Sequence, residues 1–443
     1  MREKEFLPFL EEKMGIKELN PMQRQMMAQA SESRDIILLS PTGSGKTLAF
    51  VLPMLKILRP STGRVQAIVV APSRELVIQI SQIITKLATG FKVTQLYGGH
   101  KVEDEVNSLS AGTDIIVATP GRLLDHIRRR NIDVLPTRLL VLDEFDKSLE
   151  LGFETEMKKI VGHLKNVSRY ILTSATKADI LPEFLKLNNP VTLSFLDENK
   201  ELHTRLRVHR VDSDANDKLQ TLADLLRSLA AGGVTERSII FVNYRESAER
   251  AAEYLKKCGF PVVLYHGALD QHERETAVAL FNNGSRPILV ATDLASRGLD
   301  IEDVKSIIHY HQALTPETYT HRNGRTARVD RQGDVYVLIG PKEDVKEFTD
   351  FDDTYYPDTQ APSPESPLYA TIRFSAGKKE KLSKGDIVGF LVKEGGADAK
   401  TLGKIDLYDH YALAAVPLEQ AQDILARVKG KKIKKEKRLI SLI

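Results

Sequence analysis

Cysteine and long apolar runs are nearly absent from this chain of 443 residues. Its one cysteine, Cys258, excludes an intramolecular disulfide and a cysteine-based metal cluster. The apolar runs at 36–39 and 139–142 are far shorter than the roughly 20 residues that a membrane-spanning helix needs. The first residues are charged and lack the apolar segment of a signal peptide. We therefore expect a cytoplasmic protein that has no membrane partner.

An excess of charge of either sign is also lacking, because 63 Lys and Arg residues are balanced by 60 Asp and Glu residues. The net charge of +3 would by itself argue against a protein that coats nucleic acid. The charge is unevenly distributed, however. Residues 368–443 hold 16 basic and 9 acidic residues, and 427–438 alone hold eight basic residues and one acidic residue. This density favours binding to phosphate groups, and a solvated basic tail is the alternative.

Short apolar runs alternate with helical segments in two successive stretches of the chain. Continuous apolar runs are typical of strands that are buried on both faces of a parallel sheet. We therefore predict two α/β domains with parallel sheets. The expected strands are 35–40, 67–71, 93–97, 114–118, 139–142 and 168–172 in the first domain, and 238–242, 262–265, 287–291, 306–310 and 335–339 in the second.

The expected domain boundaries follow from this pattern and from composition. The first domain is placed at 1–200, the second at 205–345 and a small α+β domain at 368–443. The polar stretch 189–217 is predicted to be the hinge between the first two. The acidic and then proline-bearing stretch 346–367 has the composition of a linker.

A glycine-rich turn, SPTGSGKT from Ser40 to Thr47, lies between an expected strand and an expected helix. Its glycines permit backbone conformations that point N–H groups at phosphates, and Lys46 can reach the β and γ phosphates. The hydroxyl of Thr47 can hold Mg²⁺. The predicted ATP-binding residues of this loop are Thr42, Gly43, Ser44, Gly45, Lys46 and Thr47.

Two neighbouring carboxylates, Asp143 and Glu144, follow the expected strand at 139–142. Asp143 can bind Mg²⁺ directly or through water, and Glu144 can orient or deprotonate the water that attacks the γ phosphate. An isolated Asp-Glu pair after a strand is usually solvated, but this pair follows a phosphate loop within one α/β pattern. We therefore predict that Lys46, Asp143 and Glu144 are catalytic.

Three arginines, Arg322, Arg325 and Arg328, lie within seven residues of the second domain. Arg325 and Arg328 are three residues apart and would share one face of a helix. An arginine beside the γ phosphate stabilises charge in the transition state. A surface helix whose arginines pair with acids is the alternative, and spacing alone leaves both open.

In this order the motifs resemble those of the DEAD-box RNA helicases of superfamily 2, with matches from about residue 6 to residue 340. The resemblance implies two RecA-like domains that hydrolyse ATP with Mg²⁺ and unwind RNA. It also implies that Phe6 stacks on adenine and that Gln23 forms hydrogen bonds with it, although the residues around Gln23 differ from the family's usual motif. The box that begins at Asp143 reads DEFD, where the family has Ala in place of Phe145.

The resemblance assigns roles along the rest of the motif series. Arg325 and Arg328 become the expected arginine fingers, and Asp300, with Arg297, is expected to bridge ATP and RNA. The residues implied to couple the two sites are Asp146, Ser174, Thr176 and His321. Those implied to contact RNA are Arg74, Gly98, Gly99, Thr119, Gly121 and Arg122 in the first domain and Asn243, Arg274, Thr292 and Arg297 in the second.

The terminal module at 368–443 resembles the RNA-binding domain of the DbpA-type DEAD-box helicases, a divergent RNA-recognition-motif fold. The matching pieces are Gly377–Lys379, Lys384–Gly389, Gly403–Asp406 and Gly430–Lys434. The resemblance implies structured large-subunit ribosomal RNA and pre-ribosomal particles as partners, with Lys431, Lys432 and Lys434 among the contacts. Aromatic residues available for stacking on bases are Tyr369, Phe374, Phe390, Tyr408 and Tyr411, of which at least half are expected to be core.

The resulting hypothesis is a monomeric ATP-dependent RNA helicase that acts in ribosome assembly. One alternative is a DNA-directed translocase of related architecture, because the choice of RNA over DNA depends on 2′-hydroxyl contacts that spacing does not show. Another is a non-catalytic RNA-clamping or chaperone protein whose ATPase is impaired by Phe145 or by the altered segment around Gln23. The intact Lys46, Asp143, Glu144 and Arg325 argue against it.

Overall fold

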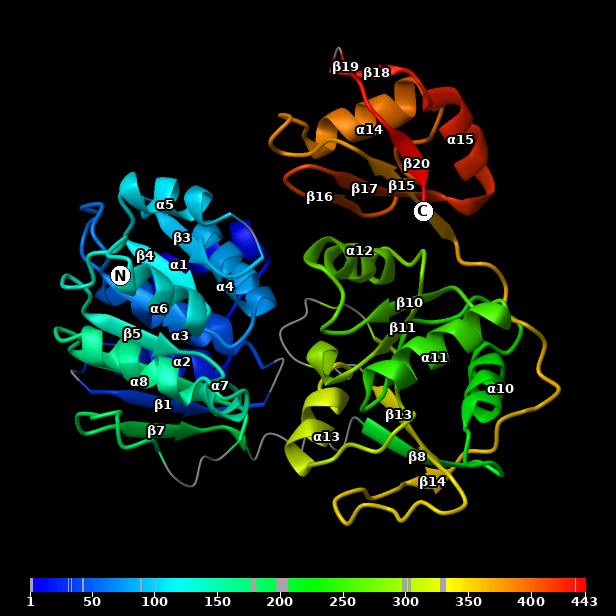
Figure 1. Ribbon diagram of the computed structural model, residues 1–443, viewed down its shortest axis with the longest axis horizontal. Helices are drawn as coiled ribbons and strands as arrows, with labels where there is room; N and C mark the ends of the chain where they lie inside the picture. The colour runs from blue at the N-terminus through cyan, green and yellow to red at the C-terminus, as the bar shows by residue number, and fades with distance from the viewer. Residues whose placement is uncertain are drawn as a thin grey trace. The chain divides into compact units, whose positions relative to one another are not determined.

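The computed structural model describes residues 3–443, except 31, 33, 42–43, 88–89, 100, 177–180, 197–205, 297–300, 302–303, 327–331 and 435. Only the backbone of 3–6, 294 and 296 is described. The chain forms two compact units that divide near residue 203 (Figure 1). The second unit contains the second α/β domain together with the C-terminal domain.

The first unit is built on a seven-stranded parallel sheet with the strand order β3-β4-β2-β5-β6-β1-β7 (Figure 1). Four of its strands are fully buried four-residue apolar runs, such as IILL in β1 and LLVL in β5, as the sequence pattern predicts. The strands are β1 (Ile36–Leu39), β2 (Ala67–Val70), β3 (Val93–Leu96), β4 (Ile115–Ala118), β5 (Leu139–Leu142), β6 (Arg169–Ser174) and β7 (Val191–Ser194).

Helices cover both faces of this sheet, so the unit has two hydrophobic cores. One core is formed with α1 (Glu3–Met14), α2 (Pro21–Gln29), α3 (Lys46–Ile57) and α4 (Arg74–Leu87). The other is formed with α5 (Val102–Ser110), α6 (Pro120–Arg128), α7 (Phe145–Glu150) and α8 (Glu154–His163). Phe145 is buried in the second core, so its bulk is accommodated among apolar side chains.

The second domain repeats the architecture with the order β10-β11-β9-β12-β13-β8-β14, again with parallel pairing throughout. Helices α10 and α11 pack on one face of it. Its strands are β8 (Leu206–Asp212), β9 (Ser238–Phe241), β10 (Val262–Tyr265), β11 (Ile288–Ala291), β12 (Ser306–His309), β13 (Gly333–Ile339) and β14 (Asp353–Thr354). Its helices are α10 (Leu219–Ala230), α11 (Arg245–Lys257), α12 (Gln271–Asn282), the 3₁₀ helix η2 (Asp293–Ser296) and α13 (Pro316–Asn323).

Two stretches differ from the sequence-based expectation. The stretch 189–217, expected to be a polar hinge, contributes β7 to the first sheet and β8 to the second. β7 is an edge strand whose residues are alternately half-buried and exposed. Because its exposed positions are polar, its sequence resembles that of a loop. The stretch 346–367, expected to be a linker, packs on the second domain: it contains β14, and the N–H of Glu365 donates to the carbonyl of Gly233 at 3.0 Å.

The C-terminal domain is a four-stranded antiparallel sheet, β16-β17-β15-β20, with two helices on one face. Side chains of β15 alternate between two faces, and Ala370, Ile372 and Phe374 enter the core under the helices. The elements are β15 (Tyr369–Phe374), α14 (Lys384–Lys393), β16 (Ile405–Leu407), β17 (Ala412–Pro417), α15 (Ala421–Val428), the hairpin β18 (Lys432–Ile433) and β19 (Glu436–Lys437), and β20 (Ile440–Leu442). The expected fold class, two parallel-sheet domains plus a small α+β domain, is confirmed.

Candidate functional site

The carboxyl ends of β5, β6 and β1 bring the predicted nucleotide motifs together in the first sheet. These strands are neighbours, with Leu39 of β1 paired with Ser174 of β6 and Leu142 of β5 paired with Leu172. The phosphate loop follows β1, the two carboxylates follow β5, and the Ser-Ala-Thr segment begins at the end of β6. Residues about 100 positions apart in sequence therefore lie at one edge of the sheet, where α/β proteins bind ligands.

The phosphate loop is closed by its own hydrogen bonds. The hydroxyl of Ser40 donates to the hydroxyl of Ser44 at 2.7 Å. Ser40 stands where the general phosphate-loop pattern has glycine, and its side chain forms this hydrogen bond. Lys46 is buried, and its Nζ donates to the carbonyl of Ser40 at 2.6 Å. Thr47 is half-buried in the first turn of α3. The predicted loop residues Thr42 and Gly43 lie outside the described residues.

Gln23 connects helix α2 to this loop. It forms a capping box with Asn20, in which the Asn20 side chain accepts from the N–H of Gln23 and Gln23 Oε1 accepts from the N–H of Asn20. Its Nε2 lies 3.4 Å from the carbonyl of Gly45, and Asn20 Nδ2 donates to the carbonyl of Ser44 at 2.9 Å. A side chain at Gly45, whose φ is 89°, would lie 2.7 Å from Gln23 Nε2. Adenine recognition by Gln23 stays a prediction, and the side chain of Phe6 lies outside the described atoms.

The two carboxylates after β5 are both buried. Asp143 Oδ1 accepts a hydrogen bond from the hydroxyl of Thr173 at 2.5 Å. Burial and then the charge of Glu144 raise the pKa of Asp143 to about 7, against the opposing effects of Thr173 and Lys46. Glu144 has a φ of 46°, which costs strain in a residue that is not glycine and is found at functional sites.

The donor set of this edge fits a Mg²⁺ ion that a nucleotide helps to hold. Oε2 of Glu144 is buried and accepts no hydrogen bond from the described residues, and a cation would offset the electrostatic cost of burying both carboxylates. Among the described residues, no group of three or more His, Cys, Asp or Glu side chains could hold a metal ion without other ligands. Mg²⁺ commonly binds through one or two carboxylates, waters and substrate phosphates, so Asp143 and Thr47 suit it.

The predicted coupling residues of the first domain contact one another. Thr176 Oγ1 donates to Asp146 Oδ2 at 2.9 Å, and Ser174 Oγ donates to the carbonyl of Thr176 at 2.6 Å. The segment after β6 is thereby tied to the carboxylate box after β5. Thr173, which the sequence analysis did not select, donates to Asp143 and accepts from the N–H of Glu144 at 3.1 Å. The sequence signal that could have identified Thr173 is a hydroxyl side chain near the end of a buried apolar strand.

The predicted RNA-contact residues of the first domain follow three further strands, β2, β4 and β3, which are neighbours. Arg74, after β2, lies with its guanidinium 4.6 Å from the centre of the Tyr97 ring and donates to the carbonyl of Gly98 at 3.2 Å. Gly99 has a φ of 97°, and a Cβ there would overlap Arg74 Nη1. After β4, Thr119, Gly121 and Arg122 lie at the start of α6. The sequence motifs did not point to Tyr97, because it comes directly before the glycine pair and belongs to none of the motifs named above.

In the second domain, Arg322 joins three of the predicted motifs. It is fully buried, although the sequence analysis gave it no role. Its Nε donates to Asp293 at 2.6 Å and its Nη2 to Asn243 Oδ1 at 2.7 Å. Burial and then the charge of Arg322 lower the pKa of the adjacent His309 to about 3, so that His309 is neutral at physiological pH. Asn243, Thr292 and α13 follow the neighbouring strands β9, β11 and β12.

The remaining second-domain candidates are described only in part. Arg325 lies just after α13 and is nearly buried, and His321 is buried within α13. Arg274 is half-buried on α12. Arg297, Asp300 and Arg328 lie outside the described residues, so their predicted roles are not tested by the geometry.

The open sheet face of the C-terminal domain packs on α12 of the second domain. Tyr411 donates to Glu275 Oε2 at 2.8 Å, and Tyr408 donates to the carbonyl of Glu275 at 3.2 Å. The rings of Tyr408 and Tyr411 stack with centres 4.4 Å apart, and Leu413 packs with Ala279. RNA-recognition motifs usually stack bases on this face. Here the two tyrosines are used inside the protein, while Phe374 and Phe390 are core as expected.

Family models match three successive stretches of the chain. The DEAD/DEAH box helicase model matches residues 20–183, the helicase conserved C-terminal domain model matches 217–330, and the DbpA RNA binding domain model matches 371–442. The chain belongs to the DEAD-box ATP-dependent RNA helicases. The expected family is confirmed.

Relatives of this DEAD-box chain include bacterial and plant proteins. RhpA of Helicobacter pylori is 32% identical over 337 residues, covering 74% of this chain and 66% of RhpA. CshA of Streptococcus pneumoniae is 34% identical over 338 residues, covering 75% and 63%. The chloroplastic DEAD-box helicase 3B of Zea mays is 36% identical over 330 residues, covering 71% and 43%. The chain thus spans between 43% and 66% of the length of these relatives.

Solved structures share the fold. Dbp5 of S. cerevisiae bound to RNA and ADP BeF3 is 27% identical, with a TM-score of 0.67, and the match covers 79% of this chain and 94% of that one. Mss116 bound to ssRNA and UDP-BeF is 24% identical, with a TM-score of 0.70 and coverage of 88% and 83%.

No helix in the described part of the chain has the length and apolarity of a membrane span.

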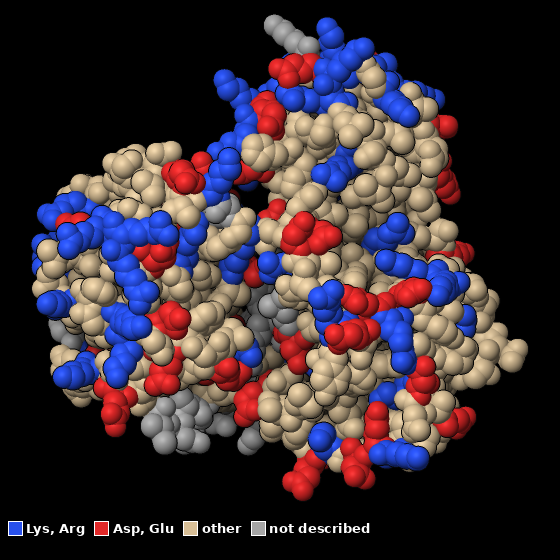
Figure 2. Space-filling view, viewed as in Figure 1, with Lys and Arg blue, Asp and Glu red and all other residues tan. Residues whose placement is uncertain are grey.

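Lys and Arg side chains of the DbpA-type domain gather around the β18–β19 hairpin (Figure 2). Two of the three predicted contact lysines make ion pairs there, Lys431 with Glu394 at 2.7 Å and Lys434 with Asp386 at 2.8 Å. Hydrogen bonds from Lys434 and Ser383 lower the pKa of Asp386 to about 2. Exposed ion pairs contribute little free energy, so a phosphate can displace them. Lys432 is exposed on β18.

A polar cluster beneath the same sheet gives a first test of the packing on α12. Thr371 Oγ1 accepts from Asn283 Nδ2 at 2.9 Å and lies 2.8 Å from the hydroxyl of Ser285, all three being buried. We expect Thr371→Val to leave Asn283 Nδ2 without this acceptor and to lower the local opening free energy by about 1–3 kcal/mol. Hydrogen exchange at β15 and α12 measures it. Thr401→Val, at an exposed turn, is the control, and equal protection in both variants would contradict the expectation.

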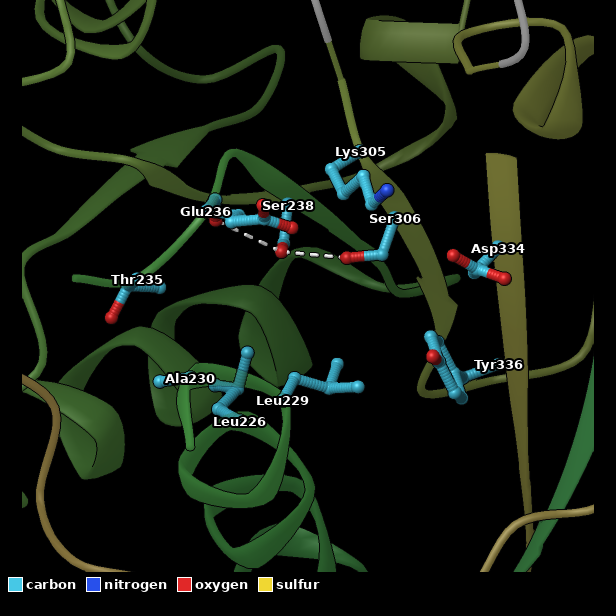
Figure 3. A pocket seen from close by; sticks show the side chains of 10 residues that line it. All are labelled: Leu226, Leu229, Ala230, Thr235, Glu236, Ser238, Lys305, Ser306, Asp334 and Tyr336. Atoms are coloured by element: carbon cyan, nitrogen blue, oxygen red, sulfur yellow. Dashed lines mark hydrogen bonds between the residues drawn. The ribbon is translucent and has the colours of Figure 1, made fainter. Parts of the chain in front are cut away.

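A pocket of about 200 Å³ in the second domain is not part of this site (Figure 3). Ser238, Ser306 and Asp334 line it at or near the starts of β9, β12 and β13, and the two serine hydroxyls are 2.8 Å apart. It therefore lies at the amino ends of these strands, whereas the described motif residues of the domain follow the carboxyl ends. Ligands of α/β sheets bind at the carboxyl ends.

Proposed function

We propose that this chain is an ATP-dependent RNA helicase that hydrolyses ATP when RNA binds and locally unwinds or remodels structured RNA. The observation that carries the proposal is the division of one sheet edge in the first domain. The phosphate loop and the carboxylates follow β1, β5 and β6, and the arginines and glycines expected to hold RNA follow β2, β3 and β4. Two ligands can therefore bind side by side on one rigid sheet.

We assign the chemical roles as follows. Lys46 and the loop N–H groups bind the β and γ phosphates of ATP, and Glu144 orients the attacking water. When bound, Mg²⁺ neutralises phosphate charge, with Thr47 and Asp143 as its protein ligands. Gln23 and Phe6 select adenine. Arg325 and Arg328 of the second domain stabilise the charge that develops on the γ phosphate.

We further propose that the bound RNA is structured large-subunit ribosomal RNA within pre-ribosomal particles, that the protein acts as a monomer, and that it works in the cytoplasm. The match to the DbpA RNA binding domain model and the basic stretch at 427–438 support an RNA anchor. Because the sheet face of this domain packs on α12, phosphate contacts from Lys431, Lys432 and Lys434 would hold the RNA.

One ATPase experiment tests the proposal and its alternatives. ATP hydrolysis is measured without nucleic acid, with a ribosomal RNA fragment and with DNA of the same sequence. We expect RNA to raise the rate and DNA to leave it unchanged. Equal stimulation by DNA would indicate a translocase on DNA, and no hydrolysis despite ATP-dependent RNA binding would indicate a non-catalytic clamp.

A further inference from the structure

A buried carboxylate outside every quoted motif lies among the proposed RNA-contact residues of the first domain. Glu105 is on α5, six residues after Gly99, and only 3% of its surface is exposed. A buried carboxylate is costly unless charged or hydrogen-bonded partners surround it. The partners of Glu105 therefore show what this side chain is placed to hold.

Three groups in the described part of the chain converge on Glu105. Oε2 accepts from Arg122 Nε at 2.5 Å and lies 2.7 Å from His126 Nε2, and Oε1 accepts from the N–H of Tyr97 at 3.0 Å. The Nδ2 of Asn131 lies 3.0 Å from the other ring nitrogen, Nδ1 of His126. An amide nitrogen can only donate, so Nδ1 accepts and Nε2 carries the proton that His126 donates to Glu105. Among the described residues, Arg122 then supplies a permanent positive charge in direct contact with the carboxylate.

The contact with Tyr97 extends this network to a second arginine. The backbone N–H of Tyr97 is held by Glu105, and its ring lies under the guanidinium of Arg74 at 4.6 Å. Arg74 also donates to the carbonyl of Gly98, the next residue along the chain. One carboxylate thus connects the ends of β3 and β4 directly and reaches the end of β2 through an aromatic ring.

Such a connection matters because arginine side chains are long and have many rotamers. An arginine that must be ordered when it meets a phosphate loses part of the binding free energy to lost rotamer freedom. The side chain of Arg122 is 15% exposed and its Nε is held by Glu105, so most of the side chain is covered while part of it still reaches the surface. Glu105 therefore prepares the arginine geometry before RNA arrives.

We propose that Glu105 is a positioning residue for RNA binding, which holds Arg122 by direct contact and Arg74 through Tyr97. The inference rests on the proposed function, because it takes these two arginines as RNA ligands. It predicts that the loss of Glu105 weakens RNA binding more than it disturbs ATP binding, whose residues follow the other half of the sheet edge.

The test uses Glu105→Gln in the full chain, with the RNA-stimulated ATPase as readout. Glutamine keeps the length of the side chain, but it removes the charge and places an NH₂ group against an existing donor in either orientation. We expect the KM for RNA to rise about tenfold and the KM for ATP to stay within about twofold. Glu103→Gln, an exposed acid on the same helix, is the matched control and leaves both unchanged.

A second variant and a double mutant separate positioning from general destabilisation. In an Arg122→Ala background, Glu105→Gln is expected to raise the KM for RNA by clearly less than in the wild type, because the two residues act together. Tyr97→Leu keeps the backbone N–H and removes the ring, and we expect it to raise the same KM through Arg74 alone. It replaces Glu105→Gln if that protein does not fold.

Two outcomes would overturn the inference: a KM for RNA in Glu105→Gln equal to that of Glu103→Gln, or equal increments in the wild-type and Arg122→Ala backgrounds. A lowered melting temperature with an unchanged KM for RNA would show a purely structural role. A wild-type protein whose ATPase does not respond to RNA would instead contradict the proposed function.

Discussion

Glu144→Gln is expected to lower the rate of RNA-stimulated ATP hydrolysis by about 10²–10⁴-fold while ATP-dependent RNA binding persists. The carboxylate follows β5, where a strained backbone holds it beside Asp143, and within the described part of the protein its Oε2 accepts no hydrogen bond. A group held in this way is available to accept a hydrogen bond from a water molecule. Glutamine has the same shape but cannot take up the proton. Phosphate release and the anisotropy of labelled RNA measure the two effects.

The matched control is Glu154→Gln, an exposed acid at the start of α8, which should hydrolyse ATP at the wild-type rate. Since an amide of the same shape replaces a buried carboxylate, we expect little loss of thermal stability in Glu144→Gln. A variant that still turned over at a rate close to the wild type would remove Glu144 from the role of orienting water.

Arg325→Ala is expected to lower the hydrolysis rate by about 10³-fold or more, with a much smaller change in ATP affinity. Arg325 lies in a short segment that is fixed on both sides. Arg322 is anchored to Asp293 and Asn243, and the hydroxyl of Thr326 donates to the carbonyl of Val304 at 2.6 Å. A guanidinium carried by so constrained a backbone is suited to a charge that develops only in the transition state.

Single-turnover hydrolysis at saturating ATP and RNA measures this effect, and Arg207→Ala, at an exposed position of β8, is the control. Arg325→Lys keeps the positive charge but lacks the planar guanidinium group, so it should restore only part of the hydrolysis rate. Because Arg325 is nearly buried, circular dichroism must show that each variant is folded. A loss of ATP binding as large as the loss of rate would contradict the finger role.

The sequence was sufficient for the central strands because their burial leaves a simple pattern. Runs such as 36–39 and 139–142 are apolar at every position since helices cover both faces of the sheet. Strands at the edges of the sheets are only partly covered, so this pattern is absent from them. β7 has two exposed positions and β14 has two residues only, so both were expected within a hinge or a linker. Their pairing with β1 and β8 depends on partners that are distant in the chain.

The motif residues were likewise recognised from local spacing, because phosphate and metal binding need particular side chains close together in sequence. The residues that hold them were not. Thr173, Tyr97 and Glu105 belong to none of the recognised motifs, and Arg322 received no role. Hydrogen bonds, and for Tyr97 a ring contact with Arg74, nevertheless place all four among the motif residues. Each contact becomes visible only once the strand order is known.

The sequence by itself determined the family and the two parallel-sheet domains with a basic terminal module, and it predicted the phosphate loop and its carboxylates. Only the tertiary structure decided that β5-β6-β1 and β3-β4-β2 divide one edge between nucleotide and RNA motifs. It also decided that the tyrosines of the terminal domain pack on α12. The physical reason is that periodicity and motif spacing record burial and local chemistry, whereas strand order and domain packing arise from contacts between segments far apart in the chain.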